Sequence, residues 1–283
     1  MASYLTPNRT SDEIGDYHTY ANPNDFVANF NLFDPSSPTN LSFIGEYAAV
    51  VSNGITVNYS APLLPAPEWI GSVGEAVFLI GAERNSLWGA SYAPSFSNLA
   101  VPNISWSTDL VMFTHNSAQN ILSTSYHVIE LLSNTRFTTT RPVSTIENFG
   151  PLYYVAGENT PVGQHVFKAA VYNATGNVPV TVQFDNVAPG TRANLTVLTG
   201  AGPTASNTLN SITGAVVSTS TIVTSGDAGF VFELPDLSVA VLATFASNSP
   251  DSTYATELLK SGFGGYTGCS LGREVSQGWG NGC

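Results

Sequence analysis

The pattern of apolar residues changes near Pro142, and this change limits what the 283-residue chain can fold into. Before that point, short apolar runs alternate with segments of helical period, which favours parallel strands joined by helices. After it, from about Phe149 to Phe245, runs rich in β-branched and aromatic residues follow one another with turns but no helical segment between them. That spacing indicates an antiparallel β-sandwich. The sequence therefore predicts a multidomain chain, with an α/β part followed by an all-β part.

Four segments of the first half carry clear signals. Residues Pro67–Asn85 have Pro in the first turn and repeat apolar residues every three or four positions, as an amphipathic helix does. Ser125–Asn134 is predicted as a second helix. Ser42–Val51 and Asp109–Thr114 are short apolar runs, and we predict that each forms a strand.

Strand predictions for the second half rest on β-branched and aromatic content, with turn residues between the runs. The predicted strands are Val166–Tyr172, Val178–Phe184, Ala193–Leu198, Gly229–Leu234 and Leu237–Thr244. We expect a first domain over residues 1–142 and a β-sandwich over 143–246. A Gly- and Ser-rich tail over 247–283 lacks a sustained period, so we expect it to be poorly ordered.

The charge of the chain argues against several kinds of partner. There are 20 acidic and 8 basic residues, giving a net charge of −12, and no cluster of Lys and Arg. Binding to nucleic acid or to an anionic membrane surface is therefore disfavoured, whereas a neutral polysaccharide is compatible with this charge. The apolar runs are too short to span a bilayer. No two of the four His have the spacing of metal ligands, so we expect neither a metal nor another cofactor.

Composition is typical of an extracellular protein, although Met1 to Tyr20 contains no signal peptide. Charged residues make up only 10% of the chain. Asn-x-Ser/Thr sequons begin at Asn8, Asn40, Asn58, Asn103, Asn173 and Asn194, which is consistent with secretion without establishing it. Cys269 and Cys283 could pair in an oxidising compartment, and their spacing does not decide whether they do.

Glu46 is the carboxylate whose setting most suggests catalysis. It follows the apolar run 41–45, where a charged side chain must be paired, solvated in a cleft or protonated. Gly45 leaves room beside it, and Tyr47 could supply a hydroxyl group or a ring face. A glutamate at the end of a strand is more often structural, so its position leaves both interpretations open.

A second polar cluster precedes Glu46 in the chain. In an extended segment Asp16, His18 and Tyr20 share one face. Such a group can hydrogen-bond a sugar and orient a nearby carboxylate. A structural network at the end of a strand explains the same residues equally well.

Seven stretches in one order, spanning roughly residues 3–243, carry a resemblance to a known family. They are DYHTYANPNDF (16–26), FIGEYA (43–48), GEAVFLIGAERNS (74–86), GASYAPSFSN (89–98), WSTDLVMFTHN (106–116), TSYHVIELLSNTR (124–136) and LPDLSVAVL (234–242). Together they resemble the α-L-arabinofuranosidases of glycoside hydrolase family 51, particularly the fungal type. The resemblance covers the C-terminal half only. It implies the last strands of a (β/α)8 TIM barrel, followed by a C-terminal, jelly-roll-like antiparallel β-sandwich.

The resemblance also implies a role for individual residues. Glu46 becomes the nucleophile of a retaining mechanism, Tyr20 hydrogen-bonds its carboxylate, and His18 lines the subsite of the cleaved sugar. Asn98 and Trp106 are further expected contacts to the substrate.

The general acid/base that this family carries has no counterpart in the sequence. In the family it is a Glu in an Asn-Glu pair at the end of the fourth barrel strand. Glu13, Asp16 and Asp34 do not replace it, so the acid/base is unknown and absent from the chain. We expect an incomplete gene model, more than a processed chain, and little or no glycosidase activity from these residues alone.

The expected function is the release of terminal non-reducing α-L-arabinofuranosyl residues from arabinoxylan or arabinan, with a polysaccharide or an arabino-oligosaccharide as the partner. One alternative is a non-catalytic carbohydrate-binding β-sandwich that stacks sugars on aromatic side chains. The candidates for such stacking are Tyr153, Tyr154, Phe167 and Tyr172. The other alternative is an inactive fragment. The oligomeric state is not predicted.

Overall fold

The structure is a computed structural model that describes residues 15–35, 42–55, 66–85, 87–93, 96–98, 109–113, 120–144, 148–207, 215–227 and 229–246. The chain divides into one unit over Met1–Ala246, which holds all of these residues, and a second over Ser247–Cys283. The expected tail therefore lies outside the described residues.

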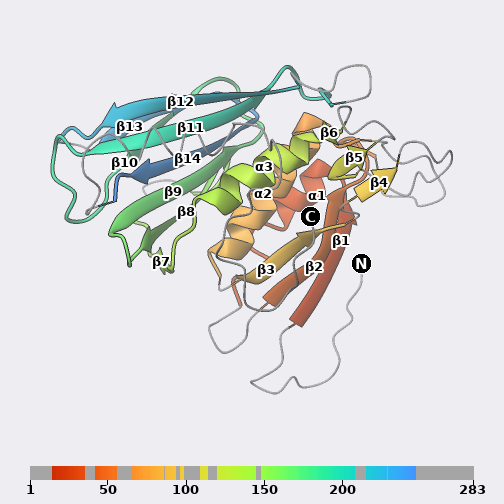
Figure 1. The fold of residues 1–283 in the computed structure, drawn as a ribbon, viewed down its shortest axis with the longest axis horizontal. Coiled ribbons are helices and arrows are strands. Elements are labelled where there is room, and N and C mark those ends of the chain that lie inside the picture. The colour runs from red at the N-terminus through yellow and green to blue at the C-terminus, as the bar shows by residue number, and fades with distance from the viewer. Residues whose placement is uncertain are drawn as a thin grey trace, which may run out of the picture. The chain divides into compact units, whose positions relative to one another are not determined.

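Three strands form a parallel sheet in the order β1 (Gly15–Ala21), β2 (Ser42–Ala49) and β3 (Leu87–Tyr92) (Figure 1). Parallel neighbours need a crossover connection. The first connection contains the short helix α1 (Pro23–Ala28), and the second contains the longer helix α2 (Trp69–Glu83). The predictions of a strand at β2 and of a helix at α2 are confirmed.

Shorter elements follow along the chain. Strands β4 (Phe96–Asn98) and β5 (Val111–Phe113) are parallel, and β5 pairs with β6 (Ile121–Leu122) in the antiparallel sense. Helix α3 (Thr124–Asn134) begins at Ser123, whose hydroxyl group accepts a hydrogen bond from the Tyr126 N–H at 3.2 Å. The structure thus confirms the predicted strand at β5 and the predicted helix at α3.

The second half is an antiparallel assembly of two sheets. The larger has the order β12-β11-β14-β9-β8-β7, and β10 pairs with β13 in the smaller. Their bounds are β7 (Thr139–Arg141), β8 (Leu152–Asn159), β9 (Gln164–Val171), β10 (Val178–Val182), β11 (Arg192–Gly200), β12 (Val216–Thr224), β13 (Phe230–Leu234) and β14 (Ser238–Thr244). All five predicted strands are present, and β7, β8 and β12 are additional. The described chain is mostly sheet.

Strand β9 shows how the larger sheet is covered on both faces. Val166 and Ala170 pack into a core that includes residues of α2 and α3. On the opposite face of β9, Phe167, Ala169 and Val171 pack into a second core with residues of β10 and β13. Because both faces are covered, β9 is buried without alternation from Val166 to Val171, including the charged Lys168.

Helix α2 takes part in two cores. Its residues Val73, Ala76 and Val77 face the larger antiparallel sheet, and Phe78 and Ala82 face the parallel strands. Figure 1 shows α2 running beside both sheets. None of the described helices is long and apolar enough to cross a membrane.

Candidate functional site

A β-bulge shapes the pairing of β1 with β2. Tyr17 pairs with Ile44, and the next residue, His18, pairs with Glu46, so Gly45 is the extra residue in β2. Glu46 therefore lies within β2, which continues to Ala49, and does not end the strand as we expected. The apolar run continues beyond it because Tyr47, Ala48 and Ala49 are buried.

Two side chains of β1 contact the Glu46 carboxylate. The Tyr20 hydroxyl group donates a hydrogen bond to Glu46 Oε2 at 2.6 Å, and His18 Nδ1 lies 3.4 Å from the same oxygen. All of these contacts fall on Oε2. The hydrogen bond implied for Tyr20 is present, and the roles of the three residues stay predictions.

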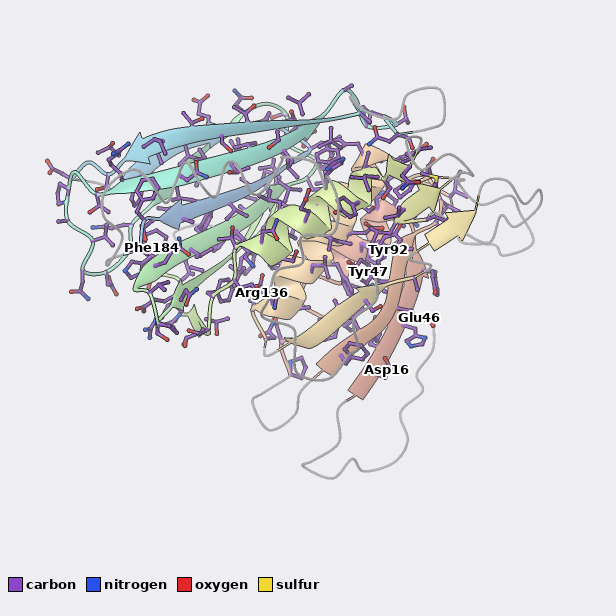
Figure 2. All side chains as sticks on the ribbon, in the orientation of Figure 1. Asp16, Glu46, Tyr47, Tyr92, Arg136 and Phe184 are labelled. Carbon is purple, nitrogen blue, oxygen red and sulfur yellow. The ribbon has the colours of Figure 1, made fainter. Side chains whose placement is uncertain are left out.

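Asp16 contacts the other side of the His18 ring. His18 Nε2 lies 3.0 Å from Asp16 Oδ2, and Asp16 Oδ1 accepts a hydrogen bond from the Gly45 N–H at 3.1 Å. The imidazole thus lies between two carboxylates. Asp16, His18 and Tyr20 share one face of β1, as predicted, and Figure 2 shows Asp16 and Glu46 at the parallel strands.

Only glycine fits at position 45 without displacing the Asp16 and His18 side chains. A Cβ atom there would lie 2.3 Å from Asp16 Oδ1 and 2.8 Å from His18 Nε2. The side chains around it are open to solvent, since the Asp16, His18 and Glu46 side chains are 57%, 47% and 42% exposed. Among the described residues, this is an accessible acidic cluster with one imidazole at its centre.

Tyr47 does not face the cluster. It is 2% exposed and packs edge-on against Tyr92, with ring centroids 5.3 Å apart. Burial, together with the nearby Glu75 carboxylate, raises the pKa of Tyr47 well above its usual value. The expectation that Tyr47 offers a hydroxyl group or a ring face to a ligand is therefore wrong in this structure, because the ring is part of the core.

Glu75 of α2 is a buried carboxylate that the sequence interpretation missed. It is 1% exposed and accepts hydrogen bonds from the Ala49 N–H and the Ser125 hydroxyl group, both at 2.6 Å. Burial raises its pKa to about 7, although both hydrogen bonds act in the opposite direction. A signal was available in the sequence, because Glu75 is the one charged residue between Glu68 and Glu83 of a largely apolar helix.

The two other predicted sugar contacts are not tested by the geometry. Asn98 ends strand β4, but its side chain is outside the described part of the structure, as is the whole of Trp106. No group of three or more His, Cys, Asp or Glu residues placed so that it could hold a metal ion occurs among the described residues.

The aromatic side chains considered for sugar stacking belong to the cores. Tyr154, Phe167 and Tyr172 are between 5% and 8% exposed, and Tyr153 packs against Phe30 with ring centroids 5.0 Å apart. Since they present no exposed row, they do not support a carbohydrate-binding surface on the antiparallel sheets.

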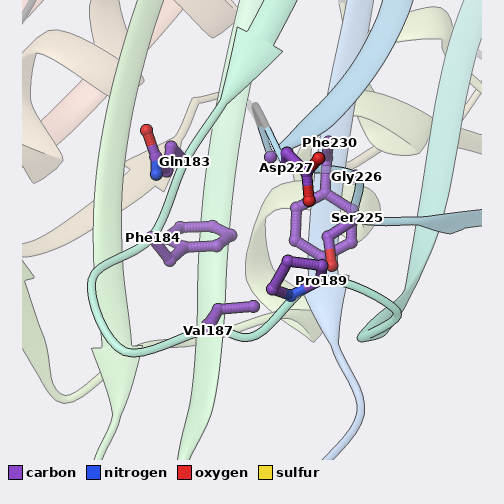
Figure 3. A pocket seen from close by; sticks show the side chains of 9 residues that line it. Gln183, Phe184, Val187, Pro189, Ser225, Gly226, Asp227 and Phe230 are labelled. Atoms are coloured by element: carbon purple, nitrogen blue, oxygen red, sulfur yellow. The ribbon is translucent and has the colours of Figure 1, made fainter.

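One small pocket of about 70 Å³ lies in the antiparallel part of the fold (Figure 3). It is lined by residues of two loops, among them Phe184, Ser225 and Asp227, and contains none of the predicted site residues. It is too small to hold a sugar ring, because binding pockets for small molecules usually enclose about 300 Å³ or more.

Comparison with known proteins points to a single family. The family described as alpha-L-arabinofuranosidase C-terminal domain matches residues 45–238. The chain is 37% identical over 233 residues to alpha-L-arabinofuranosidase A of Aspergillus niger, which covers 81% of this chain and 33% of the relative. It is 38% identical over 232 residues to a probable alpha-L-arabinofuranosidase A of Aspergillus terreus, which covers 80% of this chain and 33% of the relative.

Solved structures agree with the sequence matches. The arabinose-bound MgGH51 α-L-arabinofuranosidase superposes with a TM-score of 0.71 at 28% identity, covering 82% of this chain and 37% of that chain. The α-L-arabinofuranosidase of Thermotoga maritima, in its arabinose complex, gives a TM-score of 0.57 at 15% identity, over 81% of this chain and 52% of that one. The chain spans about a third of the length of the curated relatives that it matches.

Proposed function

Because the chain belongs to the α-L-arabinofuranosidases of glycoside hydrolase family 51, we propose that it acts as a retaining glycoside hydrolase. Its reaction releases terminal non-reducing α-L-arabinofuranosyl residues from arabinoxylan or arabinan. The observation that carries this proposal is the Glu46 carboxylate, which receives the Tyr20 hydroxyl hydrogen bond at 2.6 Å and lies beside His18. A carboxylate held in this way can attack an anomeric carbon.

Glu46 is the nucleophile in this mechanism. Tyr20 and His18 both contact Oε2, which leaves Oε1 to bond to the sugar. The hydrogen bond from Tyr20 fixes the direction of the carboxylate. The covalent arabinofuranosyl-enzyme is then hydrolysed by water. His18, and beyond it Asn98 and Trp106, contact the sugar.

The proposal also assigns the finer architecture. Strands β1, β2 and β5 are the sixth, seventh and eighth strands of a (β/α)8 barrel, and the antiparallel sheets form the C-terminal, jelly-roll-like sandwich. The boundary between them lies near residue 142. The protein is extracellular, and of the two sequons among the described residues, Asn173 is the better placed to carry a glycan because it is exposed in the turn after β9.

None of the residues in this chain is assigned as the general acid/base. Protonation of the leaving oxygen commonly contributes a factor of about 10² to 10⁴ in rate. We therefore expect little or no hydrolysis of 4-nitrophenyl α-L-arabinofuranoside by the 283-residue chain. Hydrolysis at a substantial rate that Glu46→Gln abolishes would contradict this expectation.

Trapping the covalent intermediate tests the nucleophile without the acid/base. A 2-fluoro arabinofuranoside with a dinitrophenolate leaving group needs no protonation to depart. We expect the intact mass of the chain to rise by one fluoroarabinosyl group, and peptide mapping to place that group on Glu46. Glu46→Gln should remain unlabelled.

Two further samples make the trapping result specific. Glu130→Gln removes a carboxylate from α3 outside the cluster, and it should label like the wild-type chain. The second sample is a chimera in which this chain replaces the matching third of the A. niger relative. The relative supplies the remaining sequence, so the chimera should hydrolyse the 4-nitrophenyl substrate. The assignment would be refuted if another carboxylate carried the label, or if Glu46→Gln did not lower the hydrolysis rate of this second sample.

A further inference from the structure

Glu75 joins three elements through one buried carboxylate. The residue belongs to α2, Oε1 accepts from the N–H of Ala49 at the end of β2, and Oε2 accepts from the hydroxyl group of Ser125 in α3. No basic side chain among the described residues contributes to its pKa. A carboxylate buried without a cation is costly, so its two hydrogen bonds are what stabilise it in this position.

The end of β2 depends on this contact because β3 stops earlier. Pairing of β2 with β3 ends at Tyr47 opposite Tyr92, whereas pairing with β1 continues to Ala49 opposite Ala21. Beyond Tyr47, the described residues give β2 a strand neighbour on one side only, which is β1. On the other side the Glu75 carboxylate accepts the hydrogen bond of the Ala49 N–H.

Helix α2 also approaches this end of β2 closely. A Cβ atom on Gly71 would lie 2.9 Å from the Cβ atom of Ala49, so the helix has no room to move toward the strand. Gly71 and Glu75 are four residues apart and thus lie on the same face of α2. Steric contact and the hydrogen bond together fix the position of Ala49, which follows Glu46 by three residues.

Hydroxyl groups behind Glu75 allow it to be held in either protonation state. Ser72 Oγ lies 2.9 Å from Ser125 Oγ, where either atom can be the donor, and 2.7 Å from Thr124 Oγ1. Thr124 in turn donates to the Pro67 carbonyl oxygen at 3.0 Å. Tyr47 is the titratable side chain that faces Glu75 from β2. When Glu75 is protonated, its O–H can donate a hydrogen bond to Ser125 Oγ while the other carboxyl oxygen still accepts from the Ala49 N–H.

We propose that Glu75 is a positioning residue for Glu46, acting through the backbone of β2. By holding the Ala49 N–H, it keeps the last residues of β2 in register with β1. That register sets His18 opposite Glu46 and Tyr20 opposite Ala48, and so aims the Glu46 carboxylate at both side chains. That the direction of the Glu46 carboxylate matters for catalysis rests on the proposed function, whereas the coupling between Glu75 and Glu46 is a property of the fold.

Carboxyl resonances of the full chain, labelled with ¹³C at Glu Cδ, measure this coupling directly. Glu46→Gln identifies the Glu46 signal, which is then followed across about pH 4 to 9. In the wild-type chain we expect the Glu46 signal to show an inflection near pH 7, where Glu75 titrates. Glu75→Gln should remove that inflection and keep the acidic-pH position of the signal, because the amide oxygen still accepts from Ala49.

Glu75→Leu removes the acceptor for Ala49, and we expect it to displace the Glu46 signal. Val73→Ala is the matched control, because it deletes buried methyl groups from the same helix on the face toward the antiparallel sheet. It should leave the Glu46 signal in place. If Glu75→Leu does not fold, Ser125→Ala replaces it, with a smaller displacement expected.

An unchanged Glu46 signal in the folded Glu75→Leu chain would overturn the proposal, as would an equal displacement in Val73→Ala. No sugar is present in this measurement. A chain that shows the coupling but is not labelled by the fluoroarabinoside refutes the proposed function and leaves the positioning role intact. Labelling at Glu46 without the coupling refutes the positioning role.

Discussion

Strands β1 and β2 of the parallel sheet carry exposed charged side chains, whereas β9 of the larger antiparallel sheet carries a buried one. On β1 and β2, Asp16, His18 and Glu46 are open to solvent and contact one another. On β9, the charged Lys168 is 1% exposed and is held by Glu83 at 2.6 Å and by the Leu132 carbonyl oxygen at 2.8 Å. Exposed charges are free to meet a ligand, whereas the buried pair joins α2 and α3 to the sheet.

Removal of Lys168 should have the largest effect on stability. Burial raises the pKa of Glu83 and lowers the pKa of Lys168, and in each case the partner opposes the shift. Lys168→Ala leaves the Glu83 carboxylate and the Leu132 carbonyl group without this donor, so we expect a loss of about 3 to 5 kcal/mol in the free energy of unfolding, measured in urea. Lys168→Met combined with Glu83→Gln should recover much of the loss.

Arg141→Ala is the matched variant for an exposed pair. Arg141 and Glu158 form an ion pair on β7 and β8, and the Arg141 side chain is 51% exposed. We expect a small change in the urea midpoint. If Lys168→Ala and Arg141→Ala had equal effects, the contrast between buried and exposed charges in this fold would be wrong.

The stability contributed by Glu75 and the stability contributed by Glu158 should change with pH in opposite directions. Glu75, whose pKa is about 7 in the fold, titrates near 4.3 when unfolded, so between these values the folded chain holds an extra proton. Its contribution is present in full below the unfolded pKa and is lost as pH rises through 7, by about 4 kcal/mol. The Arg141 hydrogen bond lowers the pKa of Glu158, which therefore stabilises the fold above its unfolded pKa and ceases to do so on acidification.

Urea midpoints at about pH 4.5 and 8 measure these opposite slopes. Glu75→Gln should remove part of the loss of stability on going to high pH, and Glu158→Gln should remove part of the loss on acidification. A Glu75→Gln chain with the same pH dependence as the wild type would mean that the buried carboxylate does not titrate in this range.

How much the sequence predicts also differs between the regions. Helices α2 and α3 follow from their apolar period, and β9 and β14 from β-branched runs. Strand β12 escapes prediction because most of its residues are exposed and its central positions are Ser and Thr, so no apolar face marks it. Predictions based on a pattern of apolar residues work only where one face is buried.

The candidate site could also be predicted in part from the sequence. The period of two in an extended segment places Asp16, His18 and Tyr20 on one face, and the structure brings them to Glu46. The bulge at Gly45 was not predictable, because it depends on the register between strands that are far apart in sequence. Glu75 was missed for a related reason: its partners Ala49 and Ser125 come from two other elements.

Alanine at Gly45 should have the smallest effect on stability and a large one on the site. The new Cβ atom would displace the Asp16 and His18 side chains, which are exposed and can move at little cost, so we expect the melting temperature to change little, corresponding to less than about 1 kcal/mol. Moving Asp16 would break its hydrogen bond with the Gly45 N–H and its contact with His18. The ¹⁵N shifts of the His18 ring and the rate of labelling at Glu46 by the fluoroarabinoside should therefore both change.

Gly176→Ala, in a turn of the antiparallel region where no atom lies within 4 Å of the added Cβ, should leave stability, ring shifts and labelling rate unaltered. If the two alanine variants gave the same His18 signals, Gly45 would not be needed to seat Asp16 and His18 beside Glu46, and its place in the bulge would be a matter of strand pairing alone.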